Sequence, residues 1–294
     1  MQRSGPVAFF KQSLKSDAFH ADELINIYLL RPIAAMVVWV LYPTRVTPNE
    51  VTMFAILLGI AAAAAYTLNT PAAIFIGGIL VTAKDVFDDA DGQLARAKGL
   101  YSRRGRFLDS IGDFVVDLLL FSAITFAVYQ SYPDAATICL GVLSFLGITL
   151  RVSYHVFYQV SYLHTENNYK LNRITEGITE EDLRGDPVAL RLQVVFNFIY
   201  TWQDNMMCSI DAWCMGGVVP EHKTAAWYSD KLALRLSGLL GFGTEFAVLT
   251  IFSLFNKLYL YLWLNVLVMN GIWLLAILHR RLVVRRKFSR HRTA

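Results

Sequence analysis

The chain has 294 residues, of which 55% are hydrophobic and only 17% are charged, and its formal net charge is +4. Soluble proteins carry about 25% charged residues, so this composition excludes an ordinary soluble domain as well as a disordered chain. It indicates an integral membrane protein with several spans. The small positive charge gives no reason to expect a nucleic-acid partner. Three scattered cysteines are too few for a disulfide or metal framework.

Six stretches have the length and apolar character of membrane helices, each of which needs about 20 residues. They lie at residues 48–68, 71–98, 105–130, 133–162, 236–255 and 258–281. The second stretch is apolar only as far as Ala83 and then continues through a group of carboxylates. The gaps after the first, third and fifth stretches allow only tight hairpins between antiparallel helices. The predicted fold is an all-α integral membrane protein with six transmembrane helices.

Two further apolar segments carry too many polar groups to be counted as spans. Residues 25–42 are interrupted by Arg31 and Pro32, which favours a helix at the membrane interface over a seventh span. Residues 188–213 combine apolar residues at helical spacing with charged ones such as Asp204. We interpret them as an amphipathic helix that lies on the membrane surface or folds against the bundle.

The chain then divides into five parts. An N-terminal interfacial segment (1–47) comes first, and helices one to four (48–163) follow it. An insertion (164–235) then separates helix four from helices five and six (236–282). A basic tail (283–294) ends the sequence.

The placement of basic residues predicts the orientation of these helices. Residues 96–106 contain five lysines and arginines and residues 280–292 contain seven, whereas the loops on the opposite side carry only Asp134 and Lys257. The positive-inside rule therefore places both termini, the loop between helices two and three and the insertion in the cytoplasm. An even number of spans agrees with two termini on one side.

Four aspartates form two pairs near the cytoplasmic ends of the second and third helices. Asp88 and Asp91 are three residues apart, and Asp109 and Asp113 are four apart, so each pair lies on one helical face. Because the two helices are neighbours, the pairs can converge. Four carboxylates at close range repel one another unless cations compensate their charge. Oxygen ligands favour a hard ion, Mg²⁺ or Mn²⁺, and we expect two such ions.

The residues around the aspartates suit a phosphate-containing ligand. Gly92 and Gly105 carry no side chain, so a ligand or another backbone can approach closely. Arg96 lies about two turns beyond Asp88, where its planar guanidinium group suits a phosphate oxyanion. Metal ions, an arginine and a spare carboxylate are the groups that phosphoryl-type transfer requires.

The spacing of these residues matches a known signature at all of its fixed positions. The eight positions, spread over residues 88–113, are Asp88, Asp91, Gly92, Ala95, Arg96, Gly105, Asp109 and Asp113. The chain thus resembles the CDP-alcohol phosphotransferases, also called CDP-alcohol phosphatidyltransferases. The resemblance extends to the six-span plan and to residues 47–52 before the first span, but not to residues 164–235.

This resemblance implies a function and a division of roles. Members of the family transfer a substituted phosphate from a CDP-linked donor to an alcohol, release CMP, need divalent metal and are usually homodimers with a site open to the cytoplasm. By position, the metal ligands would be Asp88, Asp91, Asp109 and Asp113, and Asp113 would also be the general base. The nucleotide and pyrophosphate pocket would be formed by Gly92, Ala95, Arg96 and Gly105, with Asn49 nearby.

Two of the candidate residues also have structural interpretations. Asn49 lies within the pattern of a capping box, in which Thr47 and Glu50 cap a helix that begins with proline. Arg151 is costly in lipid and is expected to face the bundle. There it either binds a phosphate of the acceptor or head group, or pairs with an acid such as Glu245.

The predicted function is that of a membrane transferase of phospholipid biosynthesis, which moves a phosphatidyl group from CDP-diacylglycerol to an alcohol. One alternative is transfer from a CDP-aminoalcohol to diacylglycerol, although residues 109–113 lack the histidine associated with that type. A more distant alternative is a cation or proton transporter, for which an internal repeat would be expected and none is found. The identity of the alcohol stays open.

Overall fold

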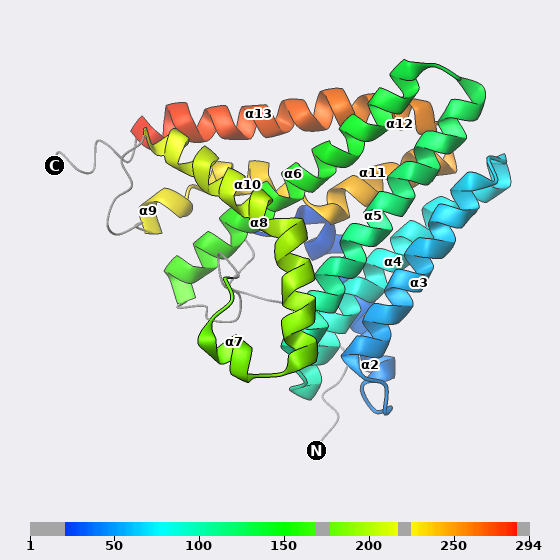
Figure 1. Ribbon diagram of the computed structural model, residues 1–294. Helices are drawn as coiled ribbons and strands as arrows, with labels where there is room; N and C mark the ends of the chain where they lie inside the picture. Colours follow the sequence, from blue (N-terminus) through cyan, green and yellow to red (C-terminus); the bar gives the residue numbers. More distant parts are fainter. Residues whose placement is uncertain (1–20, 168–176, 217–224, 287–294) are drawn as a thin grey trace.

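The computed structural model describes residues 21–167, 177–216 and 225–286, and every regular element in these ranges is a helix (Figure 1). Those marked η are π-helical turns. In chain order the elements are η2 (Asn26–Leu30), α2 (Arg31–Leu41), α3 (Pro48–Thr67), α4 (Pro71–Lys98), α5 (Arg103–Ser131), α6 (Ala135–Asn167), α7 (Glu180–Arg184), α8 (Pro187–Met215), α9 (Ala225–Tyr228), α10 (Lys231–Gly238), α11 (Phe242–Leu254), α12 (Leu258–Leu264), η3 (Asn265–Met269), α13 (Asn270–His279) and η4 (Arg280–Val284).

Helices α3, α4 and α5 form the part of the bundle that carries the signature. Helix α3 packs along both α4 and α5, while α2 and α11 pack on α4. Small residues allow the close approach of α3 and α5, because a side chain on Gly59 would collide with Val116 and one on Gly112 would collide with Ile56. This packing brings the second half of α4 and the first half of α5 to one end of the bundle.

Local sequence signals determine where these helices begin and end. The N–H of Thr47 donates to Glu50 Oε2 at 2.7 Å, and the Glu50 N–H donates to Thr47 Oγ1 at 3.4 Å, so the predicted capping box is confirmed. Helix α4 ends at Gly99, whose φ of 67° lies in the left-handed region that favours glycine. Helix α5 begins after Ser102, whose hydroxyl accepts from the Gly105 N–H at 2.9 Å.

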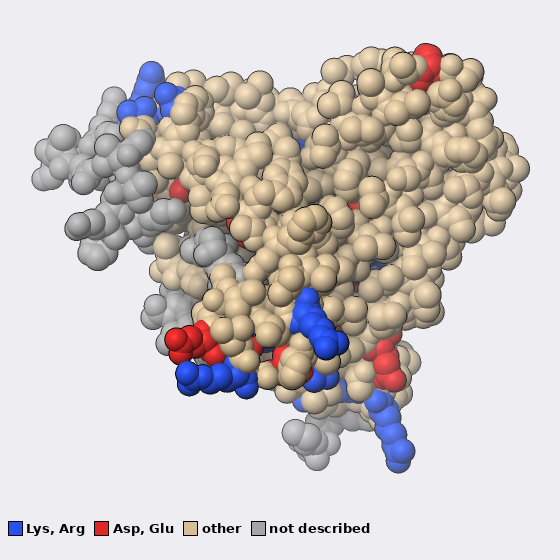
Figure 2. Space-filling view, in the orientation of Figure 1, with Lys and Arg blue, Asp and Glu red and all other residues tan. Residues whose placement is uncertain are grey.

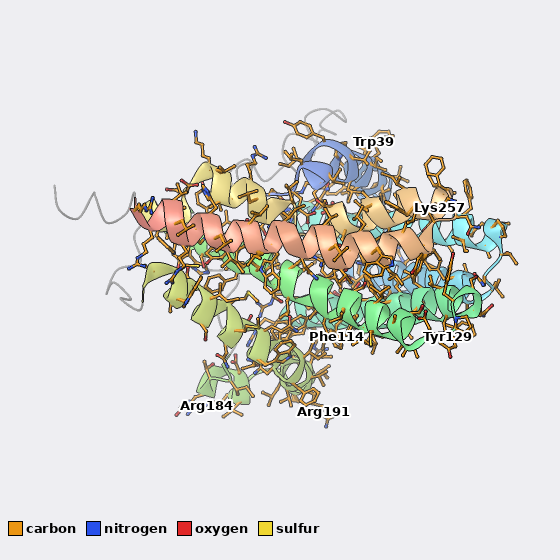
Figure 3. All side chains as sticks on the ribbon, turned by 90° about the horizontal axis from the view of Figure 1, so that it is seen from above. Trp39, Phe114, Tyr129, Arg184, Arg191 and Lys257 are labelled. Atoms are coloured by element: carbon orange, nitrogen blue, oxygen red, sulfur yellow. The ribbon has the colours of Figure 1, made fainter. Side chains whose placement is uncertain are left out.

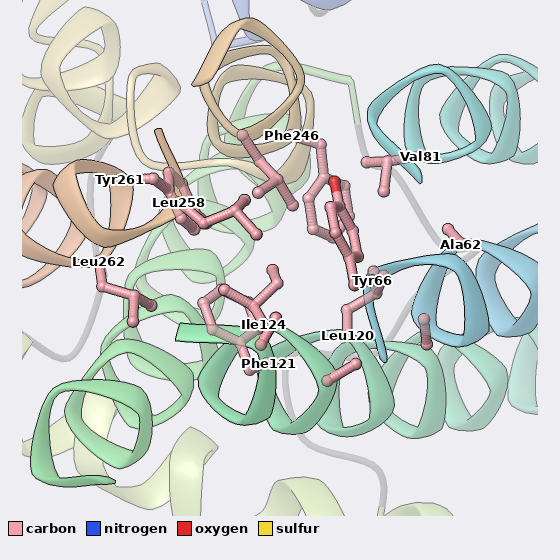
Figure 4. Packing of buried hydrophobic residues seen from close by; sticks show 14 of the residues in the cluster. Ala62, Tyr66, Val81, Leu120, Phe121, Ile124, Phe246, Leu258, Tyr261 and Leu262 are labelled. Atoms are coloured by element: carbon pink, nitrogen blue, oxygen red, sulfur yellow. The ribbon is translucent and has the colours of Figure 1, made fainter. Parts of the chain in front are cut away.

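The bundle interior combines apolar packing with a few hydrogen bonds between helices. Figure 4 shows Tyr66, Phe121, Phe246 and Tyr261 among the buried side chains of this core. The Tyr66 hydroxyl lies 2.8 Å from Ser253 Oγ, which links α3 to α11. Since lipid is as apolar as the side chains themselves, such close packing and interhelical hydrogen bonds hold membrane helices together.

Four helical segments have the length and apolar composition of a membrane span. They are Pro48–Thr67, Arg103–Ser131, Ala135–Thr165 and Leu258–Val284, the last of which joins α12, η3, α13 and η4. A fifth is counted if α10 and α11, which meet at an angle of 43°, form one broken span. Helix α4 is long enough but carries Lys84, Asp85 and Asp88 from its midpoint onward. The described residues therefore support four or five of the six predicted spans.

The charged side chains of this face lie mostly at one end of the molecule. Figure 2 shows lysines, arginines and acids gathered at the lower end, around α7 and the beginnings of α5 and α8, and at the far end of α13. An acidic side chain also lies at the upper right tip, and the rest of this face is almost without charge. A large uncharged surface with most of its charge at one end is the surface expected of a membrane protein.

The predicted fifth span is interrupted where α10 gives way to α11. The N-terminal segment packs at this point, and Glu23 Oε2 accepts a hydrogen bond of 2.8 Å from the Thr244 N–H in the first turn of α11. Gly241 and Gly243 make the room, because a side chain at either position would collide with Glu23 or Asn26. The break thus depends on a segment that is distant in sequence.

Both segments that were not counted as spans form helices packed on the bundle. Together η2 and α2 span Asn26–Leu41, which is too short to cross a membrane, and they pack on α4 with Trp39 on the outer surface (Figure 3). Helix α8 packs against α5 and α6, which agrees with folding against the bundle. The rest of the predicted segments, at residues 1–20, 168–176, 217–224 and 287–294, lies outside the described residues.

Candidate active site

Three signature aspartates meet between α4 and α5. Asp88 and Asp91 of α4 and Asp109 of α5 each offer one carboxylate oxygen, and these oxygens lie within 4.8 Å of one another. Asp109 Oδ1 is buried and has no hydrogen-bond partner in the structure. A buried carboxylate oxygen without a donor is costly, and a hard divalent cation satisfies it. The three residues therefore fit a Mg²⁺ or Mn²⁺ ion, and we call them the aspartate triad.

Helix α3 holds one member of the triad in place. The hydroxyl of Thr52, which is 3% exposed, donates to Asp91 Oδ2. Thr52 lies two residues after Glu50 of the capping box. The cap, which sets where α3 begins, therefore also sets the position of this hydroxyl along the helix axis. Thr52 is not among the site residues predicted from the sequence, because a single threonine near the start of a membrane helix carries no distinguishing pattern.

Asp113, the fourth predicted ligand, lies outside the triad and pairs with a lysine. The ammonium nitrogen of Lys84 lies 2.6 Å from Asp113 Oδ1, 3.5 Å from Asp88 Oδ2 and 3.8 Å from Asp85 Oδ1. Lys84 is only 1% exposed. It is also absent from the residues predicted from the sequence. The available signal was a lysine inside a predicted membrane helix, one turn before the first signature aspartate.

The predicted nucleotide residues lie in two places beside the triad. On α4, Gly92 is next to Arg96, because an added Cβ at Gly92 would be 3.5 Å from Arg96 Nη1. At the beginnings of α3 and α5, Asn49 packs on Gly105, since an added Cβ there would be 2.6 Å from Asn49 Oδ1. Gly105 thus allows the two helix ends to approach. Ala95 lies in the last turns of α4, where its carbonyl accepts from the Leu100 N–H at 3.0 Å.

Arg151 is not part of this site. Its guanidinium group donates to Glu245 Oε2 at 2.7 Å and to Asn270 Oδ1 at 2.6 Å, and both Arg151 and Glu245 are at most 1% exposed. Glu245 also accepts from the Tyr261 hydroxyl at 2.7 Å and from the side chain of Asn265. Of the two interpretations of Arg151, the structure shows the pairing with Glu245.

A cavity of about 330 Å³ lies beside Asp113 between α5, α6 and α8. Its wall includes Asp113 itself and Phe114, which Figure 3 shows on the side of the bundle toward α8. The other lining residues are partly apolar and partly polar: Arg106, Ser110, Asp117, Thr149, Val152, Ser153, Val156, Phe157, Val160, Phe196, Tyr200, Gln203, Asp204 and Phe242. Part of the predicted insertion therefore forms one wall of the cavity.

Hydrogen bonds and ion pairs hold that part of the insertion against α5. The Tyr200 hydroxyl donates to the Ser110 carbonyl at 2.6 Å. Closer to the beginning of α5, Arg103 pairs with Asp182 and Arg104 pairs with Asp186. The hydrogen bond from Arg104 lowers the pKa of the exposed Asp186 carboxyl to about 2. These contacts fasten α7 and α8 to the helix that supplies Asp109 and Asp113.

The family profile described as CDP-alcohol phosphatidyltransferase matches residues 45–219. The chain belongs to this family. The resemblance inferred from the signature is thereby confirmed, but its expected extent was wrong, because the match continues through residues 164–219. The matched region contains the triad, Lys84, Asp113 and the cavity-lining part of α8.

Three similar proteins carry the name bifunctional IPC transferase and DIPP synthase. The one from Archaeoglobus fulgidus is 32% identical over 96 residues, which is 33% of this chain and 18% of that protein. The one from Thermococcus kodakarensis is 33% identical over 133 residues, 45% of this chain and 29% of that protein. The one from Aquifex aeolicus is 36% identical over 89 residues, 30% of this chain and 20% of that protein. The chain thus matches less than a third of each relative.

Proposed function

We propose that this protein transfers a substituted phosphate from a CDP-linked donor to an alcohol and releases CMP, with Mg²⁺ or Mn²⁺ as cofactor. One observation carries the proposal. Three signature aspartates from two helices bring their oxygens within 4.8 Å of one another, beside a cavity whose wall includes the fourth. Family membership supports the same reaction class, and the similar proteins are named as a transferase and a synthase.

The triad and its neighbours would bind the donor. Asp88, Asp91 and Asp109 would hold the cation, which supplies positive charge where the pyrophosphate bond breaks. Arg96, on the same helix, would bind a phosphate oxygen through its guanidinium group. The nucleotide would lie along Gly92, Ala95 and Gly105, with Asn49 at its edge.

Asp113 would act as the general base on the acceptor. Its side chain is 14% exposed and lies in the wall of the cavity, so a hydroxyl group bound there can reach it. Lys84 holds Oδ1, which leaves Oδ2 to accept the proton. Ser153 and Gln203, which are hydrogen-bonded to each other in the cavity wall, would contact polar groups of the acceptor.

The donor that we propose is CDP-diacylglycerol, so that the product is a phospholipid. A second candidate is transfer from a CDP-aminoalcohol to diacylglycerol. The side chains of Phe114, Val152 and Phe157 in the cavity wall favour this candidate, because they make an apolar surface beside the base.

The reaction class can be tested with purified protein and a panel of substrates. CDP-diacylglycerol would be offered with polar alcohols, and CDP-aminoalcohols with diacylglycerol, while CMP release is measured in Mg²⁺. We expect release with one of the two sets and none from an Asp88→Asn variant. A folded protein that releases no CMP with either set contradicts the proposal, and cation flux in proteoliposomes would then favour the transporter alternative.

We further propose a homodimer with six spans, in which α4 crosses the membrane and the site and both termini are cytoplasmic. The pairing of Lys84 with Asp113 supports the crossing by α4, because it neutralises charges that this helix carries into the bundle. The homodimer is proposed from family membership alone. In a variant without native cysteines, Tyr101→Cys should resist an impermeant maleimide in intact cells while Lys257→Cys reacts. Labelling of Tyr101→Cys without permeabilisation would invert the topology. The same test at Ser289 uses a position outside the described residues.

A further inference from the structure

Lys84 lies in an environment built for a permanent positive charge. On one side its ammonium nitrogen contacts Asp113 at 2.6 Å and Asp88 at 3.5 Å. On the other side lie the rings of Phe242 and Phe246, with both centroids 5.8 Å from the nitrogen. Aromatic faces attract a cation, and the burial of Lys84 keeps it away from water. The ammonium group is therefore held between carboxylates and rings.

A second metal ion that used Asp113 as a ligand, as the resemblance implies, would lie beside this ammonium group. Lys84 already bonds to Asp113 Oδ1 and lies close to Asp88 Oδ2. Because like charges repel strongly in a poorly solvated interior, a divalent ion beside Asp113 and the ammonium group exclude each other.

We propose that Lys84 takes the place of a second metal ion, so that the protein binds one divalent ion, on Asp88, Asp91 and Asp109. Asp113 is then a partner of Lys84 rather than a metal ligand. Lys84 is a positioning residue that holds the Asp113 carboxylate on the cavity wall. The inference rests on the proposed function only in taking the triad as the metal site, and it replaces the two ions expected from the signature with one.

The charge balance of the site supports this assignment. Asp85 and Asp117, both buried, also lie near Lys84 on α4 and α5, and Asp117 Oδ1 has no hydrogen-bond partner in the structure. Among the described residues, the side of the site that holds Asp113 therefore has more carboxylates than cations, since Lys84 faces three of them and the other cation on the cavity wall is Arg106. When Lys84 loses its charge, these carboxylates remain without compensation, and a divalent ion becomes the available replacement.

Metal counting tests the proposal without measuring turnover. Purified protein in detergent would be titrated with Mn²⁺ alone, and the free ion would be followed by electron paramagnetic resonance. We expect one ion for each chain of the wild type and of Lys84→Arg, and two for Lys84→Gln. The matched control is Lys98→Gln, which removes a lysine from the end of the same helix, where it bonds to the Thr44 and Val46 carbonyls. This control should bind one ion. Two ions in the wild type, or one in Lys84→Gln, would overturn the proposal.

A second variant keeps the test decisive if Lys84→Gln does not fold. Asp113→Asn should bind one Mn²⁺, and its affinity should fall by less than about 100-fold, because the loss of a residue that only supports the ligands typically costs about 10–100-fold. A greater loss of affinity in Asp113→Asn would show Asp113 to be a ligand and overturn the assignment. One ion with no CMP release contradicts the proposed function alone, whereas two ions with normal release contradict this inference alone.

Discussion

The carboxylate site between α4 and α5 and the Arg151 network between α6, α11 and η3 both bury charged side chains among apolar helices. In the network one arginine meets one glutamate, and neighbouring amide and hydroxyl groups bind both of them. In the carboxylate site a single lysine lies among many aspartates. A balanced buried pair requires nothing further, whereas a site with excess negative charge is completed by a cation. Burial of charge alone thus does not mark function, but unbalanced burial does.

Removal of divalent metal should have the largest effect on activity, and it should act on the carboxylate site but not on the Arg151 network. Excess EDTA should abolish CMP release, and Mg²⁺ or Mn²⁺ should restore it, because the described triad contains only carboxylate ligands. The Arg151 network, which needs no ion, should keep the protein folded, as the retention of its elution volume in detergent would show. Full activity in excess EDTA would contradict the assignment of a metal site.

Asp113→Asn should have the second largest effect, which is on turnover. General base catalysis contributes about 10²–10⁴-fold to a rate, so turnover should fall by at least that order while donor affinity changes little. Asp88→Asn should instead weaken metal and donor binding together, since it removes a member of the triad. Both effects are measured as donor affinity and CMP-release rate across a metal titration. Near-normal turnover of Asp113→Asn at high metal concentration would rule out the role of base.

Arg151→Met should have its effect on stability. It leaves Glu245 buried without its partner, and breaking a buried ion pair typically costs about 3–5 kcal/mol. Adding Glu245→Gln should recover most of that loss, as thermal unfolding in detergent would show. Asp109→Asn is the comparison variant, because it removes one charge from the unbalanced site and should not destabilise the metal-free protein. If Arg151→Met and Asp109→Asn had equal effects, the distinction between the two regions would fail.

Glu23→Gln comes last, because its effect on stability should be confined to a window of pH. Burial raises the pKa of Glu23 from 4.5 to about 8, with the charges of Asp22 and Asp89 adding to the shift. The folded protein therefore binds the proton more tightly than the unfolded chain, and the wild type loses stability as pH rises from about 5 to 8. The glutamine variant cannot ionise. Its free energy of unfolding should rise by roughly 4 kcal/mol relative to the wild type over this window, since one pKa unit is about 1.4 kcal/mol and the pKa of Glu23 is raised from 4.5 to about 8.

The melting temperatures of wild type and Glu23→Gln at pH 5 and pH 8 provide the measurement. Asp186→Asn is the matched control, because the Arg104 guanidinium already holds the pKa of Asp186 at about 2 and its charge does not change in this window. Its difference from the wild type should be the same at both pH values. If the difference in melting temperature between Glu23→Gln and the wild type were also the same at both pH values, the raised pKa of Glu23 would be wrong.

Local features of the site could be predicted because their cause is local. The spacing of Asp88 and Asp91 places both carboxylates on one helical face, and the two joined helices bring Asp109 to them. The capping box at Thr47 and Glu50 follows equally from residues three positions apart. The expectation that Asp113 completes a four-ligand set stays untested, and the structure places it 2.6 Å from Lys84.

The sequence by itself determined the membrane class, the family and the helical faces on which the aspartates lie, because hydropathy and helical spacing are properties of neighbouring residues. Only the tertiary structure decided which side chains those faces meet. Lys84 and Asp113 are 29 residues apart in the sequence, and Thr52 and Asp91 are 39 residues apart. Arg151 and Glu245 are separated by 94 residues, and Glu23 is 221 residues from Thr244 in the first turn of α11. Such contacts depend on how whole helices pack, and no periodicity within one helix contains that information.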